Sequence, residues 1–155
     1  MTQAVSVSQA TFDDADVQAL LMRHFDLMRA SSPKESCHVM RPDALLYRGV
    51  LLYVARDSSD VVGVGALAQL DAQHGELKSM HTAAEARGRG VGRAILAALL
   101  LAARDQGMTR VSLETGVADM FAPARALYAA HGFEECPPFG AYIPDPLSVF
   151  MTCAL

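Results

Sequence analysis

The residues with the clearest chemical pattern form a basic, glycine-rich segment from Arg87 to Arg93. Its sequence, Arg-Gly-Arg-Gly-Val-Gly-Arg, mixes guanidinium groups with glycines and leads into a long apolar stretch. Glycine lets a ligand approach the backbone closely, and the first N–H groups of a helix have no partners within that helix. Because the helix dipole adds about half a positive charge at this end, the segment predicts a phosphate-binding site.

Two common phosphate-binding patterns do not fit this segment. The P-loop needs Gly-Lys-Ser/Thr after four intervening residues, and the chain has no such run. The dinucleotide fingerprint G-x-G-x-x-G fails because Arg93 stands where the third glycine belongs. What remains is the pattern Arg87-x-x-Gly90-x-Gly92.

This pattern, placed after a strand and before an apolar helix, resembles the acetyl-CoA pyrophosphate loop of the GNAT superfamily of N-acetyltransferases. A second element adds to the resemblance: Ala126-Leu127-Tyr128 and then His131-Gly132-Phe133 are similar to the later Leu-Tyr…Gly-Phe element of that family. The resemblance covers roughly residues 50 to 135. It implies an α/β (α+β) fold with a mixed, mostly antiparallel sheet of about six or seven strands and helices on both faces.

The resemblance also implies the co-substrate, acetyl-CoA, and no metal. The loop would hold the pyrophosphate, and the pantetheine arm would pair with the backbone of the preceding strand, like an added strand. Strand alternation places the His81 side chain opposite its neighbours, so we expect it to pack or face solvent and not to act as a base. The implied cofactor-binding residues are Met80, His81, Thr82, Arg87, Gly88, Arg89, Gly90, Val91, Gly92 and Arg93.

Acyl transfer to an amine requires a base for the amine proton and an acid for the departing thiolate. In the resembled family the tyrosine of the Leu-Tyr pair lies near the coenzyme sulfur, which implies that Tyr128 is the acid; the alternative is a tyrosine that only packs on the sheet. Glu114, at the end of a short strand, is the first candidate for the base. It could instead cap the turn at Thr115-Gly116, and Glu76 or a water relay remains open as the base.

The acceptor pocket is predicted less specifically. Loops over a rigid scaffold commonly carry specificity, and the segment from Ser31 to Pro42 is such a loop, with Glu35 and His38 as candidates. His24 lies on the apolar face of the first helix and is predicted to be core or to line a groove. The substrate-binding candidates are His38, Glu76, Phe139 and Tyr142.

These side chains suit a primary amine of a small molecule or amino-acid-like metabolite, and the lack of an acidic cluster disfavours polyamines and aminoglycosides. No cysteine motif supports a covalent acetyl-enzyme, so direct transfer in a ternary complex is predicted. Three alternatives stay open: a non-catalytic acyl-CoA sensor, a protein N-terminal or lysine acetyltransferase, and a regulatory domain that binds another nucleotide.

The composition of the chain limits the class of protein to which it can belong. The chain has 155 residues, 52% of them hydrophobic, which predicts one domain over residues 1–155. A net charge of −4 disfavours nucleic-acid and membrane partners. Its three cysteines fit neither a disulfide framework nor a zinc site, and no secretory signal is visible, so a cytoplasmic location is expected. The expected partners are the small-molecule amine and, in a homodimer, a second copy of the chain.

The elements that must position these residues follow from hydrophobic periodicity and turn signals. A strand near Val5 and a helix from about Thr11 come first. A meander of three strands then leads to the glycine segment, and in the last of them residues 76, 78, 80 and 82 are expected on one face. The predicted strands and helices span residues 49–55, 61–70, 76–82, 91–107 (helix), 110–114, 119–130 (helix) and 147–153, with a proline-rich loop over 136–146.

Overall fold

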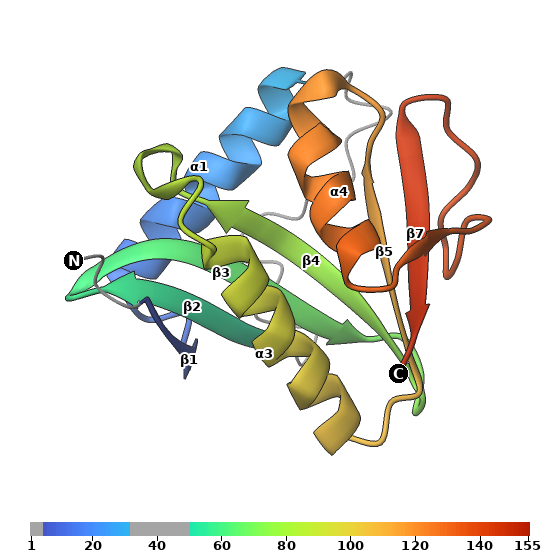
Figure 1. The fold of residues 1–155 in the computed structure, drawn as a ribbon, viewed down its shortest axis with the longest axis horizontal. Coiled ribbons are helices and arrows are strands. Elements are labelled where there is room, and N and C mark those ends of the chain that lie inside the picture. Colours follow the sequence, from blue (N-terminus) through green and yellow to red (C-terminus); the bar gives the residue numbers. More distant parts are fainter. Residues whose placement is uncertain (1–4, 32–49) are drawn as a thin grey trace.

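A computed structural model describes residues 5–31 and 50–155 of the chain (Figure 1). The described strands form one sheet in the order β1-β2-β3-β4-β5-β7-β6, in which only β4 and β5 run parallel. The main elements are β1 (Ser6–Ala10), α1 (Ala15–Ser31), β2 (Leu51–Asp57), β3 (Asp60–Gln69), β4 (His74–Thr82), α3 (Val91–Asp105), β5 (Arg110–Gly116), α4 (Ala122–Ala130), β6 (Glu134–Glu135) and β7 (Ser148–Ala154).

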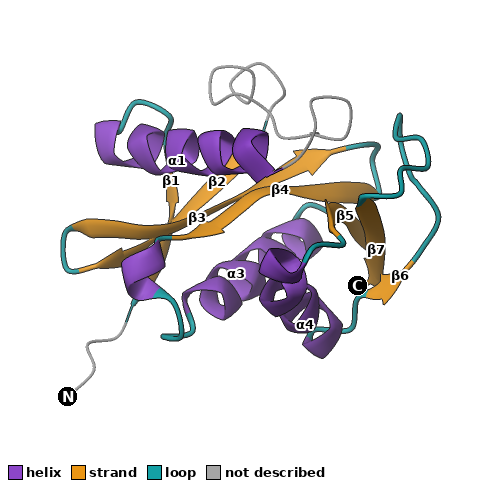
Figure 2. Cartoon of the chain, turned by 90° about the horizontal axis from the view of Figure 1, so that it is seen from above, coloured by secondary structure: helices purple, strands orange, loops and turns teal. Residues whose placement is uncertain are grey.

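Helices cover both faces of the sheet, as the fold prediction requires. Figure 2 shows α1 on one face and α3 with α4 on the other. Single turns of 3-10 helix, Ala84–Ala86 and Asp119–Phe121, precede α3 and α4. The prediction of a mixed, mostly antiparallel sheet between helical layers is therefore confirmed.

Helix α1 begins at Ala15, later than the predicted start near Thr11, because Asp14 caps it. The Asp14 carboxylate accepts hydrogen bonds from the backbone N–H groups of Asp16 and Val17, at 2.8 and 3.3 Å. Its other oxygen pairs with Arg56 of β2 at 2.8 Å, and these contacts hold the pKa of Asp14 below its usual value. The helix then buries one apolar face, which includes Val17, Leu20, Leu21, His24 and Phe25.

Helix α3 packs its apolar face on the centre of the sheet. Ile95, Leu96 and Leu99 are almost completely buried there. The chain leaves the helix at Gly107, whose φ of +82° is the left-handed conformation that favours glycine after a helix, as predicted.

A β-bulge in β4 corrects one prediction. The pairing of β3 with β4 shifts register between Val64 and Ala66, and Ser79 has a φ of +56°. After this extra residue Met80 lies toward α3, while His81 lies toward α1 and contacts His24. Residues 76 and 78 therefore face α1 and residues 80 and 82 face α3, so the expectation that all four share a face is wrong.

Strands β4 and β5 separate soon after they meet. Their pairing joins only His74, Gly75 and Glu76 to Arg110, Val111 and Ser112. Beyond these pairs β4 continues beside β3, and β5 continues beside β7, so the two strands diverge (Figure 1). The ends of both strands therefore border an opening in the sheet.

The close packing behind the bulge depends on Gly65 of β3. A Cβ atom there would lie 2.6 Å from Met80 Sδ, 2.7 Å from Ile95 Cγ2 and 2.9 Å from Leu99 Cδ1. We expect Gly65→Ala to lower the free energy of unfolding by about 1–3 kcal/mol, because these side chains must move from well-packed positions. Urea denaturation measures it, with the exposed α3 substitution Ala97→Ser as the control; equal stability of the two variants would contradict the packing described here.

Candidate active site

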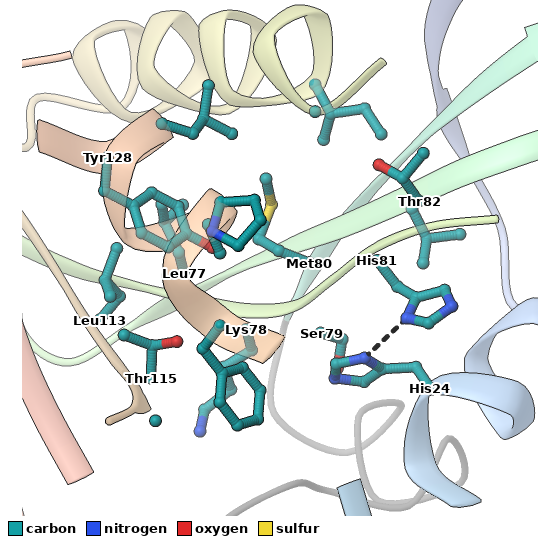
Figure 3. Close-up of a pocket in the computed structure, with 18 of the residues that line it drawn as sticks. His24, Leu77, Lys78, Ser79, Met80, His81, Thr82, Leu113, Thr115 and Tyr128 are labelled. Atoms are coloured by element: carbon teal, nitrogen blue, oxygen red, sulfur yellow. Dashed lines mark hydrogen bonds between the residues drawn. The ribbon is translucent and has the colours of Figure 1, made fainter. Parts of the chain in front are cut away.

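A cavity of about 630 Å³ opens where β4 and β5 separate. Figure 3 shows side chains from β4, β5, α1 and α4 around it. Most of the site residues predicted from sequence line this one cavity: Glu76, Met80, His81, Thr82, Arg87, Gly88, Gly90, Val91, Gly92, Arg93, Glu114, Tyr128 and Tyr142.

The glycine segment has the geometry of an anion site. Gly88 and Gly90 have φ values of +80° and +78°, and Gly90 is the N-cap of α3. A Cβ atom at either position would meet nothing within 4 Å, so the backbone is open to a ligand. Because α3 is 15 residues long, its dipole and first N–H groups attract negative charge at this point.

Two of the three arginines of the segment line the cavity, and the third does not. Arg87 and Arg93 belong to the lining. The guanidinium of Arg89 instead pairs with Asp57 of β2 at 2.9 Å, outside the cavity. Its side chain therefore ties the segment to the β2–β3 hairpin.

Tyr128 projects from α4 into the cavity wall. Its side chain is 6% exposed and its ring packs on Phe133 with ring centres 5.8 Å apart. Burial raises the pKa of its phenol, so the hydroxyl keeps its proton at neutral pH. Within residues 5–31 and 50–155 its hydroxyl has no hydrogen-bond partner, so it remains available to a ligand.

Glu114 and Glu76 have different surroundings, although both carboxyls line the cavity. Burial raises the pKa of Glu114 to about 7, and a hydrogen bond from Ser148 Oγ at 3.1 Å opposes that rise. Glu76 is 4% exposed; it pairs with Lys78 Nζ at 3.1 Å and accepts a hydrogen bond from the Tyr142 hydroxyl at 2.5 Å. Glu114 is thus the carboxyl that can exchange a proton near neutral pH.

The proline-rich loop brings its aromatic residues to β4. The ring of Tyr142 packs against Phe139 and Phe150, with ring centres 5.1 and 5.4 Å apart. Phe139 is outside the cavity lining and supports Tyr142 from behind. The predicted acceptor residues Glu35 and His38 lie outside the described residues.

His24 of α1 and His81 of β4 contact each other in the cavity lining. Their Nδ1 atoms are 3.2 Å apart, as the dashed line in Figure 3 marks. Burial lowers the pKa of His24 to about 3 and that of His81 to about 4, and nearby positive charge from Arg23 and Arg87 adds to the effect at His81. Both imidazoles are neutral at pH 7, and the prediction that His24 lines a groove is confirmed.

Two polar residues of the site were not predicted from the sequence. Lys78 lines the cavity and pairs with Glu76. The two residues are two positions apart on one strand and therefore share a face, so the sequence does contain a signal for this pair. Ser148 reaches Glu114 from β7 because those strands pair in antiparallel register, with Gly116 opposite Ser148. No local pattern in the sequence indicates that contact.

Comparison with known proteins gives the family. A model of the acetyltransferase (GNAT) family matches residues 17–133, which include the glycine segment and Tyr128. The chain belongs to the GNAT family. It is an acetyl-CoA-dependent N-acetyltransferase. In this GNAT protein the glycine segment and the buried Tyr128 line the same cavity between β4 and β5.

Individual relatives agree with this family. The chain is 40% identical to the uncharacterized N-acetyltransferase YsnE of Bacillus subtilis (strain 168), over 88% of this chain and 90% of that protein. It is 42% identical to an IAA acetyltransferase of Azospirillum brasilense, over 77% of each chain. The crystal structure of a GNAT family acetyltransferase from Elizabethkingia anophelis with acetyl-CoA bound has a TM-score of 0.72 at 21% identity, and the match covers 97% and 98% of the two chains.

Two features are absent from the described residues of this GNAT protein. Within residues 5–31 and 50–155 no three His, Cys, Asp or Glu side chains are grouped to hold a metal ion. In the same part of the chain no helix has the length and apolar character needed to cross a membrane.

The histidine pair predicts a stability that depends on pH. Both folded pKa values lie below the unfolded value of 6.5, so the unfolded chain binds more protons and acid destabilises the fold. Between pH 7.5 and 5.5 we expect a loss of about 1.4 kcal/mol from His24 and less from the more exposed His81.

Urea denaturation at both pH values measures this loss. In the double variant His24→Gln/His81→Gln the loss of unfolding free energy between pH 7.5 and 5.5 should be smaller by the contributions of both histidines, because glutamine does not titrate. An unchanged pH dependence in the double variant would show that the two imidazoles are not held neutral by the fold.

Proposed function

We propose that this GNAT protein transfers the acetyl group of acetyl-CoA directly to the primary amine of a small, amino-acid-like metabolite, within a ternary complex. The observation that carries the proposal is that Glu114 and Tyr128 line the same cavity as the anion-binding segment Arg87–Arg93. A base, an acid and a coenzyme site are therefore within one space.

The coenzyme would lie along the α3 side of the opening. Its pyrophosphate would meet the backbone N–H groups at Gly88, Gly90 and Gly92, between the side chains of Arg87 and Arg93. Its pantetheine arm would pair with β4 at residues 80–82, because β5 has left the edge of β4 there. The thioester would then point toward Tyr128.

Glu114 is the best-placed base. A pKa of about 7 lets its carboxylate accept a proton from an ammonium substrate and release it to water at neutral pH. Glu76 is less suited, since Lys78 and Tyr142 already occupy its carboxylate. The amine nitrogen then attacks the thioester carbon to give a tetrahedral intermediate.

Tyr128 would complete the reaction as the acid. When the tetrahedral intermediate collapses, the carbon–sulfur bond breaks and the thiolate takes the phenol proton. The attacking nitrogen loses its extra proton to water as the amide forms, and water returns a proton to the phenolate. Burial keeps the phenol protonated until that step. The products are an N-acetylated amine and free CoA thiol.

Replacing the acid should slow catalysis without weakening coenzyme binding. Tyr128→Phe removes the proton donor and keeps the ring that packs on Phe133, so we expect kcat to fall about 10²-fold. Release of CoA thiol measures the rate, and calorimetry with CoA measures binding. Tyr53→Phe on β2, outside the cavity lining, is the control; an unaltered rate in Tyr128→Phe would remove the acid role.

Replacing the base should change the pH profile. Wild-type kcat/KM should rise through pH 7 as Glu114 loses its proton, and rise further as the amine does. In Glu114→Gln the inflection near pH 7 should vanish and kcat/KM should drop about 10²-fold, while the amine-dependent rise stays. Glu76→Gln is the matched control and should keep the inflection; if it alone loses the inflection, Glu76 is the base.

The acceptor test uses a panel of primary amines with acetyl-CoA, extended with IAA because a relative carries that compound in its name. Thiol release with any small amine supports the proposed activity. Tight CoA binding without release on every acceptor would favour a sensor instead.

A further inference from the structure

We propose that the acceptor is an α-amino acid with an apolar side chain: Lys78 binds its carboxylate, and an apolar rim around the cavity mouth receives its side chain. The inference rests on the proposed function and names the substrate class of the same site. Two independent observations carry it, one polar and one apolar.

The first observation concerns Lys78. Its side chain is only 12% exposed and lines the cavity, among the labelled β4 residues of Figure 3. An ammonium has three N–H donors; one lies 3.1 Å from Glu76 and one 3.4 Å from the Tyr142 hydroxyl. The described residues offer no partner for the third donor, and a buried donor without a partner is costly.

The charges around Lys78 favour it as the anion-binding group on the side of the cavity that faces α1. The β4 bulge divides the lining, so that Lys78 shares the α1 side with His24 and His81, which are neutral. The lining arginines, Arg87 and Arg93, belong to the coenzyme loop at the start of α3. Among the described residues that line the α1 side, Lys78 is therefore the cation that a carboxylate would contact, although the charges of Arg23 and Arg87 also reach this side at His81.

The position of Lys78 also suits the amine of the same substrate. Its positive charge reaches Glu114, where it opposes the rise in the carboxyl's pKa. An α-amino acid separates its nitrogen from its carboxylate by one carbon atom. It can thus present the amine to Glu114 while one carboxylate oxygen accepts the free N–H of Lys78.

The second observation is an apolar rim formed by two loops. Val117, Met120 and Leu147 have 42%, 46% and 40% of their surface exposed, and they make up half of the large exposed hydrophobic residues of the described chain. Met120 and Leu147 line the cavity itself, and the N–H of Val117 bonds the carbonyl of Leu147 at 3.1 Å. The rim is therefore continuous with the catalytic cavity, and exposed apolar surface of this kind marks binding sites.

The test uses matched acceptors with acetyl-CoA. We expect kcat/KM for phenylalanine to exceed that for phenylalaninamide by about 10–100-fold, because a hydrogen bond to a charged group is lost in the amide. Phenylalanine should also exceed alanine by about 10-fold, because the phenyl group covers apolar rim surface. Equal use of the acid and the amide by the wild type would overturn the role of Lys78, and equal use of phenylalanine and alanine would overturn that of the rim.

Variants separate the two contacts. Lys78→Met combined with Glu76→Gln removes the ion pair as a unit, so no buried charge is left unpaired; the preference for phenylalanine over its amide should fall below about threefold. Glu76→Gln alone keeps the ammonium and should keep that preference. Met120→Ser should lower the preference for phenylalanine over alanine and leave the preference for phenylalanine over phenylalaninamide unchanged.

A binding measurement keeps this inference distinct from the proposed function. If no amine releases thiol, the proposed transfer fails, and calorimetry with CoA and the N-acetylated products still tests recognition. N-acetylphenylalanine should bind at least about 10-fold more tightly than N-acetylphenylalaninamide, and only when Lys78 is present. Equal affinities would overturn the inference whatever the outcome of the rate assay.

Discussion

Strands β4 and β5 pair over three positions and then part, and the site depends on that limit. A parallel pair that continued would satisfy both backbone edges and close the sheet. Because it stops at Glu76 and Ser112, the edge of β4 is left without β5 from residue 77 onward. A buried strand edge needs a partner, so a co-substrate that can pair as an added strand completes the sheet. The opening between the strands can thus serve both as the proposed coenzyme site and as the gap through which an acceptor would reach it.

The bulge at Ser79 decides what each face of this opening contains. One extra residue in β4 turns Met80 and Thr82 toward α3, where the coenzyme loop begins, and turns His81 toward α1. Gly65 permits this arrangement because no side chain competes with Met80 for the space against α3. The nine residues of β4 therefore present different groups to the two faces: Met80 and Thr82 on the α3 side, and the polar side chains of Glu76 and Lys78 on the α1 side.

The sequence predicted the parts of this site that depend on local chain order. The glycine segment and Tyr128 could be found because a helix start and a Leu-Tyr pair are contiguous patterns, and the strands and helices followed from periodicity and turn residues. Contacts between distant residues could not be found in this way. The bulge depends on how β3 pairs with β4. The hydrogen bond from Ser148 to Glu114 depends on the register of β7 with β5. The Arg89–Asp57 ion pair depends on a hairpin some thirty residues earlier in the chain. These contacts decide which face of the sheet a side chain occupies. No local pattern in the sequence encodes that choice.

Burial then gives the titratable groups of the cavity their separate states. The same exclusion of water keeps Tyr128 protonated, brings the pKa of Glu114 to about 7 and leaves His24 and His81 neutral, since in every case it disfavours the charged form. Glu76 and Lys78 form an ion pair at 3.1 Å, so each offsets the charge of the other. In the half of the cavity away from the arginines the fixed charge is therefore one compensated pair, and the group free to change charge near neutral pH is Glu114. A substrate that brings both an amine and a carboxylate would match that arrangement, because its amine would meet Glu114 and its carboxylate would meet the Lys78 ammonium.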